Sequence, residues 1–322
     1  MNHGHLSTAA TGAGSFPGSY SFDFFASLIR ESQSHPAIPV AVCWPCSDLA
    51  LGGAVEAAAA GIIVPRLVGP VTTMRSIAAT AGLDLSGCEF ADVATEEEAA
   101  VTSRELCRLG QAQALMKGSL HTDMLMKYIL QKEGGLRTTR WVSHVFIMQA
   151  PLYDRALLIT DAAINIEPTL EDKVDILQNA IDLAHALGIK EPKVAILSAI
   201  ETVNPKIVST LDAAALCKMA DRGQITGAIL DGPLAFDTAI SKEAAAVKHL
   251  KSPVAGETDI LLVPDLESGN MLAKQLEYLG GASLAGIVLG AKVPIILTSR
   301  ADSSESRVTS CAVASLLAQR DQ

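Results

Sequence analysis

Short apolar segments alternate with longer helical segments along most of this 322-residue chain. Residues 38–43 form an apolar run, Ser47 can cap a helix that reaches Gly61, and a second apolar run follows at 62–68. This order predicts a strand–helix–strand unit with two parallel strands. Because 49% of the residues are hydrophobic but only 4% are aromatic, Ala, Val, Ile and Leu must fill the core. Such a composition is typical of parallel strands covered by helices, and it predicts an α/β fold.

The alternation is interrupted once, at residues 132–137 (Lys-Glu-Gly-Gly-Leu-Arg). Before the interruption, Thr95 and Glu98 have the spacing of a capping box at a helix start. After it come two β-rich runs, at 141–149 and 156–164, and then further strand–helix pairs. The chain also exceeds the usual size of a single core, so we expect a crossing into a second domain here. We expect residues 1–18, which are rich in Gly, Ser, Thr and Ala, to form a loose tail.

Charge and cysteine usage exclude several classes of protein. The formal net charge is −10, so binding to nucleic acid or to an anionic membrane is disfavoured. No apolar run is long enough to span a membrane without interruption, and the N-terminus lacks the pattern of a secretory signal. Six cysteines are scattered along the chain, which favours a reducing cytoplasm. Two of them, Cys43 and Cys46, form a Cys-x-x-Cys. No second cysteine pair accompanies it to make a zinc site, and we favour a structural turn over a redox site.

Residues 294–303, Pro-Ile-Ile-Leu-Thr-Ser-Arg-Ala-Asp-Ser, combine a strand end, a cation and a helix start. The hydroxyl residues Thr298 and Ser299 and the guanidinium of Arg300 follow the apolar part. Free N–H groups and the helix dipole favour an anion at a helix N-terminus. The segment therefore predicts a site for a phosphate-like group, and an ordinary connection with a surface arginine is the alternative.

Six motifs, in order along the chain, together resemble one known family. They are Lys-Gly-Ser-Leu-His-Thr at 117–122, Ser-His-Val-Phe-Ile-Met at 143–148, Asp-Gly-Pro-Leu-Ala-Phe-Asp at 231–237, Val-Ala-Gly at 254–256, Pro-Asp-Leu-Glu-Ser-Gly-Asn at 264–270, and Leu-Thr-Ser-Arg-Ala-Asp at 297–302. From about residue 38 to its end, the chain resembles the phosphate acetyltransferase/phosphate butyryltransferase family. The Thr-Ser-Arg-Ala-Asp form is closer to the butyryl branch.

The resemblance implies a two-domain, three-layer αβα fold, similar to that of isocitrate and isopropylmalate dehydrogenases, with the active site in the interdomain cleft. It implies a first domain of residues 19–142 and 295–322, a second domain of residues 143–294, and a homodimer. The implied reaction moves a short acyl group reversibly between coenzyme A and inorganic phosphate, with an acyl phosphate as the other product. No metal or redox cofactor is expected.

The resemblance also implies catalytic roles after residue 298. Arg300 can hold phosphate or the carbonyl oxygen through its planar fork, and Ser299 can donate to the developing oxyanion or the sulfur. The acetyl branch has an aspartate one turn into the next helix, but Ser306 stands there in this chain. Asp302 is then the nearest carboxylate. It is either the general base or, with Glu305 three residues later, the helix cap, for which Ser303 is the other candidate. Glu305 is open to the same two roles, and water or the phosphate itself could instead accept the thiol proton.

We expect the substrates to contact residues near the predicted strand ends and the domain crossing. A strand end followed by Gly118 resembles a small phosphate cradle, although an ordinary turn explains it equally well. Cations near residue 140 would meet phosphate if they face the cleft. The candidate substrate-binding residues are Lys117, Ser119, His121, Thr122, Arg137, Arg140, Ser143, Asp231, Asp265, Asn270 and Thr298.

Two other functions are considered beside the acyltransferase. One is a metal- and NAD-dependent oxidoreductase on the same fold, although no glycine-rich nucleotide fingerprint is present. The other is a non-catalytic acyl-CoA-binding partner of a hydratase module, for which the missing acetyl-branch aspartate leaves room. The acyl chain length is open, because one methylene is worth only about 1–3 kcal/mol of discrimination.

Overall fold

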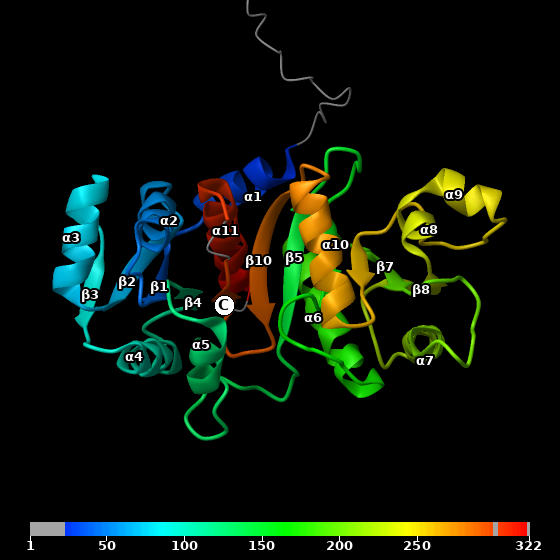
Figure 1. Cartoon of the computed structure of the whole chain (residues 1–322), viewed down its shortest axis with the longest axis horizontal. Coiled ribbons are helices and arrows are strands. Elements are labelled where there is room, and N and C mark those ends of the chain that lie inside the picture. Colours follow the sequence, from blue (N-terminus) through cyan, green and yellow to red (C-terminus); the bar gives the residue numbers. More distant parts are fainter. Residues whose placement is uncertain (1–22, 299–301, 321–322) are drawn as a thin grey trace, which may run out of the picture.

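The computed structural model describes residues 23–298 and 302–320. This part folds around one mixed, eleven-stranded sheet in the order β3-β2-β1-β4-β11-β10-β5-β6-β9-β7-β8 (Figure 1). The strands are β1 (Ile38–Cys43), β2 (Ile63–Gly69), β3 (Glu89–Asp92), β4 (Ala114–Lys117), β5 (Ser143–Gln149), β6 (Leu157–Thr160), β7 (Lys193–Leu197), β8 (Ile229–Leu234), β9 (Ile260–Leu262), β10 (Ser283–Leu289) and β11 (Ile295–Ile296). The helices are α1 (Phe24–Gln33), α2 (Asp48–Ala59), α3 (Val71–Ala81), α4 (Glu96–Arg108), α5 (Thr122–Ile129), α6 (Leu170–Ala186), α7 (Val208–Asp221), α8 (Phe236–Ile240), α9 (Lys242–Val247), α10 (Leu266–Tyr278) and α11 (Ser304–Arg320).

Two parallel sets of strands make up the sheet. Strands β3, β2, β1, β4 and β11 are parallel to one another, and so are β6, β9, β7 and β8. Between the sets, β10 pairs antiparallel with both β11 and β5, and β5 pairs antiparallel with β6. The α/β class predicted from the sequence is therefore confirmed. The domain boundaries stay a prediction, because the sheet is continuous across them.

The two faces of the sheet are packed differently. Side chains of β1 alternate: Val40 and Val42 join a core with α2 and α11, whereas Ala41 and Cys43 join another core with α4 and α5. In Figure 1, α2 and α4 accordingly lie on opposite sides of these strands. The first core continues along the whole sheet and includes residues of β5, β9 and β7.

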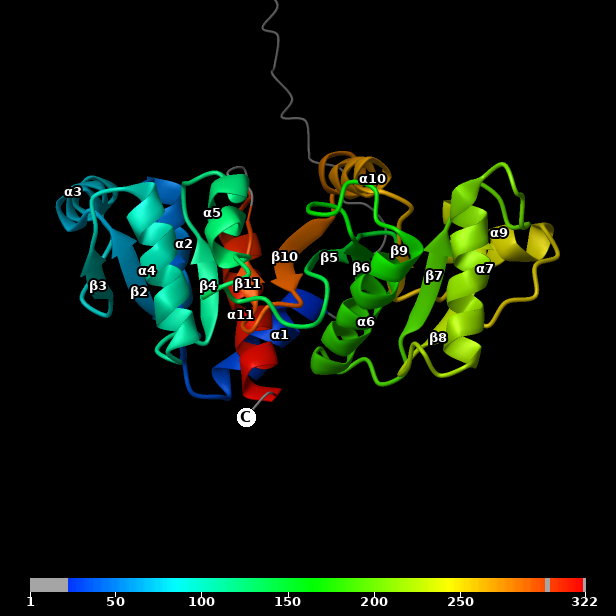
Figure 2. The same ribbon diagram turned by 90° about the horizontal axis from the view of Figure 1, so that it is seen from below.

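On the other face the core is interrupted. One part packs against α4 and α5, and a separate part packs against α8 and α10. Strand β10 contributes Val288 to the first part and Leu284 to the second. Figure 2 shows α5 and α10 on either side of β10. The region between these two helices is where a pocket can open on the sheet.

Helix starts follow local hydrogen bonds, as the sequence predicts. The side chains of Ser47 and Thr95 accept bonds from backbone N–H groups of their helices, and Thr95 forms the expected capping box with Glu98. At α11, however, Ser303 is the cap: its Oγ accepts from the backbone N–H of Ser306 at 3.1 Å. The helical residues begin at Ser304, so Asp302 lies one residue too early to cap, and the interpretation of Asp302 as the cap is wrong.

Several boundaries differ from those expected. The run at 156–164 forms a strand only at Leu157–Thr160, because the buried Asp161 carboxylate accepts the backbone N–H groups of Ala163 and Ile164 and turns the chain. Asp231 was expected at a strand end but lies inside β8. Helices α1, α8 and α9 and strand β3 were not predicted from the sequence. The expected tail falls on residues 1–18, outside the described residues. Within the described ranges, no helix has both the length and the apolar character needed to cross a bilayer.

Candidate functional site

Two neighbouring pockets share Lys117 and Thr298. The first, which we call the α2 pocket, has a volume of about 380 Å³ and is lined by Ser47, Leu49, Ala50, Lys117, Gly118, Ser119, Thr298 and Arg307. The second, the α10 pocket, has a volume of about 490 Å³ and is lined by Lys117, Leu120, His121, Thr122, Phe146, Ala163, Leu266, Asn270, Lys274, Leu297 and Thr298. The α10 pocket lies where the core is interrupted and takes residues from β4, from β5 and from α10. Of the two shared residues, Lys117 ends β4 and Thr298 follows β11, and these two strands pair side by side.

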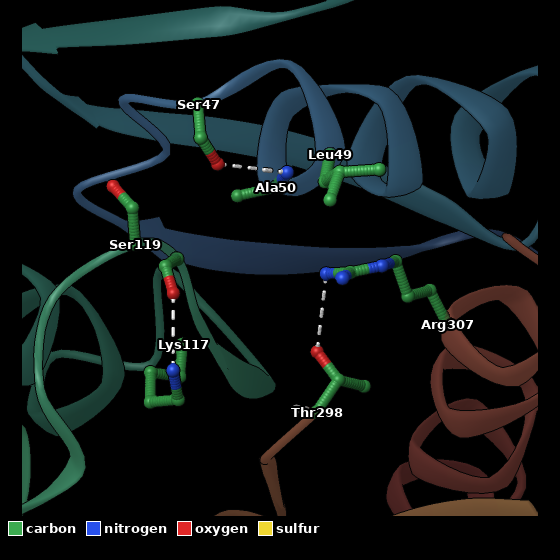
Figure 3. Close-up of a pocket in the computed structure, with 8 residues that line it drawn as sticks. Ser47, Leu49, Ala50, Lys117, Ser119, Thr298 and Arg307 are labelled. Carbon is green, nitrogen blue, oxygen red and sulfur yellow. Dashed lines mark hydrogen bonds between the residues drawn. The ribbon is translucent and has the colours of Figure 1, made fainter. Parts of the chain in front are cut away.

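Lys117 ends strand β4 and is only 6% exposed. Its Nζ donates to the carbonyl oxygens of Gly118 at 3.2 Å and Leu120 at 3.3 Å. These bonds hold the ammonium group at the start of the β4–α5 turn, where it borders both pockets (Figure 3). A buried ammonium attracts anions more strongly than an exposed one, because less water screens it.

The turn after Lys117 is packed directly against the turn after β1. A Cβ on Gly118 would lie 2.4 Å from the carbonyl oxygens of both Cys43 and Trp44, so only glycine fits. Ser119 Oγ donates to the Trp44 carbonyl at 2.9 Å and accepts from the Cys46 backbone N–H at 3.1 Å. The Cys-x-x-Cys segment therefore serves as one wall of this turn–turn contact.

The two thiols of that segment are poorly suited to redox chemistry. Both are free, and burial raises the pKa of Cys43 to about 12 and that of Cys46 to about 11. Because the thiolate is the reactive form, neither sulfur is activated at neutral pH. This supports the structural turn that the sequence favoured.

Thr298 and Arg307 face the α2 pocket from the C-terminal part of the chain. Thr298 is 3% exposed and Arg307 is 4% exposed, and Arg307 Nη1 donates to Thr298 Oγ1 at 3.4 Å (Figure 3). Sequence reasoning missed Arg307. The available signal was a single long cation among the small residues of 303–315, close to the segment already singled out. Asp302 is also buried, at 6% exposure. Ser299 and Arg300 lie outside the described residues.

Besides Lys117 and Thr298, three predicted residues line the α10 pocket, and they do so from opposite sides. His121 and Thr122 stand at the start of α5, and Asn270 comes from α10, where its Nδ2 donates to the Ala162 carbonyl at 3.1 Å. Lys274, one turn further along α10, was missed; its Nζ pairs with Glu277 at 2.7 Å. The pocket thus has one cation on each side, Lys117 and Lys274.

A buried histidine lies behind the α10 pocket. The ring of His144 packs edge-on against Phe146, with 4.4 Å between centroids, and a Cβ on Gly286 would lie 3.0 Å from its Nε2. Burial lowers the pKa of His144 to about 3, and this outweighs the neighbouring Leu297 backbone group, which favours protonation. The imidazole is therefore neutral at physiological pH.

Five predicted substrate-binding residues, and the predicted catalytic residue Asp302, line neither pocket. Arg140 pairs with Asp182 at 2.7 Å and borders another cavity, near Lys292, while Arg137 forms an isolated bridge with Ala291. The Oγ of Ser143 accepts a hydrogen bond from Asn179 Nδ2 at 2.9 Å. Asp231 lies inside the edge strand β8. Asp265 caps α10, because its carboxylate accepts from the Ser268 backbone N–H at 2.8 Å. Asp265 directly precedes Leu266, which lines the α10 pocket.

Within residues 23–298 and 302–320, no group of three or more His, Cys, Asp or Glu side chains is arranged to hold a metal ion. Whether the reaction is metal-independent stays a prediction.

Known proteins match this chain over most of its length. A family profile described as "Phosphate acetyl/butaryl transferase" matches residues 90–315. A phosphate acetyltransferase of Rhizobium meliloti is 58% identical over 293 residues, which cover 91% of this chain and 93% of that protein. A phosphate butyryltransferase of Clostridium acetobutylicum is 42% identical over 294 residues, covering 91% and 98%. The higher identity is to an acetyltransferase, so these two relatives do not support the expected closeness to the butyryl branch.

Solved structures agree with the fold. The crystal structure of a branched-chain phosphotransacylase from Enterococcus faecalis V583 superposes with a TM-score of 0.77 and 32% identity, covering 87% of this chain and 99% of that one. A 4-hydroxythreonine-4-phosphate dehydrogenase from Klebsiella pneumoniae matches with a TM-score of 0.55 and 13% identity, over 88% and 100%, and shows a shared fold alone. From the profile match and the identities, this chain belongs to the phosphate acetyl/butyryl transferase family.

Proposed function

We propose that this enzyme transfers a short acyl group reversibly between coenzyme A and inorganic phosphate where the α2 and α10 pockets meet. The identities favour acetyl over butyryl as the acyl group. The observation that carries the proposal is the buried Lys117 ammonium, which borders both pockets beside the Thr298 hydroxyl. In acyl transfer between a thiol and phosphate, both groups bond in turn to the same carbonyl carbon, and negative charge develops on the atoms around it. A cation fixed at that point stabilises the transition state.

The two pockets fit the two halves of the reaction. The α2 pocket is the smaller and is lined by the hydroxyl groups of Ser47 and Thr298 beside the cations of Lys117 and Arg307, which suits a compact, strongly solvated anion such as phosphate. The α10 pocket is larger and includes apolar side chains such as Phe146 and Leu297, which suits the acyl group and the end of the pantetheine arm. The thioester then lies across the boundary at Lys117.

Three residues that follow Thr298 in the chain supply the remaining chemistry. Ser299 and Arg300, by family resemblance, hold the carbonyl oxygen and the phosphate, and Asp302 accepts the thiol proton. Asp302 is preferred as the base because the cap of α11 is Ser303, so helix capping no longer accounts for the carboxylate. No redox cofactor or metal takes part in this scheme.

The wider architecture is part of the same proposal. Residues 19–142 and 295–322 form one domain and residues 143–294 the other, with the α10 pocket in the cleft between them. The enzyme is a cytoplasmic homodimer. A candidate contact surface is formed by the β5–β6 turn and the α10–β10 turn, where Leu152 is 79% exposed and Leu279 is 83% exposed.

A thiol-release assay tests the function directly. The purified chain is mixed with phosphate and, in separate reactions, acetyl-, propionyl- or butyryl-CoA, and free CoA is followed with a thiol reagent. Phosphate-dependent release, fastest with acetyl-CoA, is expected. A folded chain that releases no thiol with any of the three, or that instead reduces a nicotinamide with a hydroxy acid, is not the proposed enzyme.

A further inference from the structure

Arg307 is a charged residue near the start of α11, yet its side chain is buried. It lies in the first turns of α11, it is 4% exposed, and its guanidinium faces the α2 pocket rather than solvent (Figure 3). Removing a guanidinium from water is unfavourable unless charged or polar groups surround it. The Thr298 hydroxyl is one such group, and an anion bound in the α2 pocket would supply a charged one.

Helix α2 is shaped to receive this side chain. A Cβ on Gly53 would lie 2.6 Å from Arg307 Cδ and 3.1 Å from Arg307 Cβ. Glycine inside a helix is unfavourable by about 0.5–1 kcal/mol relative to alanine. The missing side chain at Gly53 lets the arginine stem pass between α2 and α11 and directs the guanidinium to the pocket.

Arg307 is the second buried cation at this pocket. Lys117, at 6% exposure, reaches it from β4, and Arg307 reaches it from α11. Hydroxyl groups of Ser47 and Thr298, which accept hydrogen bonds from Ala50 N–H and Arg307 Nη1, lie on the same walls. Two cations with surrounding hydroxyl groups match a tetrahedral dianion, which offers oxygens in several directions, better than they match a carboxylate.

We propose that Arg307 is a substrate-binding residue that, together with Lys117, holds the phosphate group in the α2 pocket. The inference rests on the proposed function and adds a residue and a substrate assignment to it. The phosphate group belongs to inorganic phosphate or to the acyl phosphate. Coenzyme A also carries phosphate groups, so the experiment includes it as a separate ligand.

The test compares Arg307→Gln and Arg307→Lys with a matched control, Arg104→Gln. Arg104 is also shielded, with 12% of its side chain exposed, but it lies on α4 and bonds Gln131 at 2.6 Å, away from both pockets. For each protein we would measure KM for phosphate and KM for acetyl-CoA, and by calorimetry the affinity of the enzyme for inorganic phosphate and for CoA. A fourth variant, Gly53→Ala, keeps every charge but displaces the arginine stem.

Loss of charge-assisted hydrogen bonds should raise KM for phosphate in Arg307→Gln by about 10- to 100-fold, with KM for acetyl-CoA within about twofold. The KM of Arg307→Lys for phosphate should lie between those of Arg307→Gln and the parent. Gly53→Ala should weaken phosphate binding in the parent. When it is combined with Arg307→Gln, it should add little further loss, because both changes act through the same side chain. If Arg307→Gln does not fold, the lysine and Gly53→Ala variants carry the same comparison.

Three results would overturn the inference. Unchanged phosphate affinity in a destabilised Arg307→Gln or Arg307→Lys protein would make Arg307 purely structural. Selective loss of CoA affinity would assign the pocket to the phosphates of coenzyme A. Equal loss in Arg104→Gln would show a general effect of removing a shielded arginine. Calorimetry needs no turnover, so an inactive parent chain that still binds phosphate through Arg307 would refute the proposed function but not this assignment.

Discussion

Replacing Gly118 by alanine tests whether the contact between the β4–α5 turn and the β1–α2 turn positions the site. The added Cβ would lie 2.4 Å from two backbone carbonyl oxygens and 2.6 Å from the Trp44 carbonyl carbon. Backbone atoms cannot move away by a change of rotamer, so one turn must shift. Overpacking of this kind is unfavourable by about 1–3 kcal/mol. If the shift also breaks the two Ser119 bonds to Trp44 and Cys46, each adds about 1 kcal/mol, for a total of about 3–5 kcal/mol.

The assay is urea denaturation at 25 °C together with the thiol-release rate. A matched control is Gly87→Ala, because Gly87 has no heavy atom within 4 Å of the added Cβ and no positive φ. We expect Gly118→Ala to lower the free energy of unfolding by the amount above. Because Lys117 would move with the turn, the turnover of the Gly118→Ala enzyme should also fall by at least about tenfold. Stability and turnover equal to those of Gly87→Ala would refute the argument.

Four further predictions concern the chemistry and its environment. Asp302→Asn should fold but lose about a hundredfold or more in turnover with an altered pH–rate profile, because the proton acceptor is removed; turnover within about twofold of the parent would exclude Asp302 as the base. Arg300→Lys should keep the fold and lose about 2–4 kcal/mol of transition-state stabilisation in kcat/KM, because lysine lacks the two-pronged donor; near-parental kcat/KM would remove Arg300 from the site. Activity should survive exhaustive treatment with a chelator, whereas loss that magnesium or manganese restores would contradict the metal-free scheme. The pKa of His144 is about 3 in the folded protein, against 6.5 for an unperturbed histidine, which represents the unfolded chain. As the pH falls below 6.5, the unfolded chain therefore binds a proton that the folded protein does not. This lowers the free energy of unfolding by about 1.4 kcal/mol per pH unit, down to about pH 3. His144→Gln should therefore flatten the loss of stability between pH 6.5 and 4 seen in urea denaturation, and His35→Gln, at an exposed position, should not; equal acid sensitivity in the parent and His144→Gln would contradict a buried neutral imidazole.

Local hydrogen bonding explains why many helix starts could be predicted. Ser47, Thr95 and Thr169 each accept a bond from a backbone N–H within three residues, so the interaction is written in a short stretch of sequence. The same holds for Gly82, which ends α3 in the left-handed conformation. At α11 the sequence offered two adjacent candidate caps, Asp302 and Ser303, and the observed start at Ser304 selects Ser303.

Strand interiors were predictable in place but not always in extent. Apolar runs identified β1, β2, β5 and β10 because both faces of these strands are buried. Strand β3 was missed, because this edge strand has the half-exposed sequence Glu-Phe-Ala-Asp and shows no apolar run. Strand β6 was overextended, because the turn at Asp161 depends on burial of its carboxylate rather than on an apolar break.

The sequence by itself determined the α/β class, most helix starts and, through ordered motifs, the family and the segments that carry its chemistry. These follow from short-range hydrogen bonds, hydrophobic periodicity and residue types at fixed spacing, which the order of residues states directly. The tertiary structure alone decided which predicted residues meet: Lys117 and Thr298 join at the boundary of two pockets, whereas Arg140 pairs with Asp182 and Asp231 lies in an edge strand. It also brought Arg307 beside Lys117 through the space left at Gly53. The physical reason is that such contacts join residues far apart in the chain, and they depend on strand order, helix packing and burial, none of which a local pattern encodes.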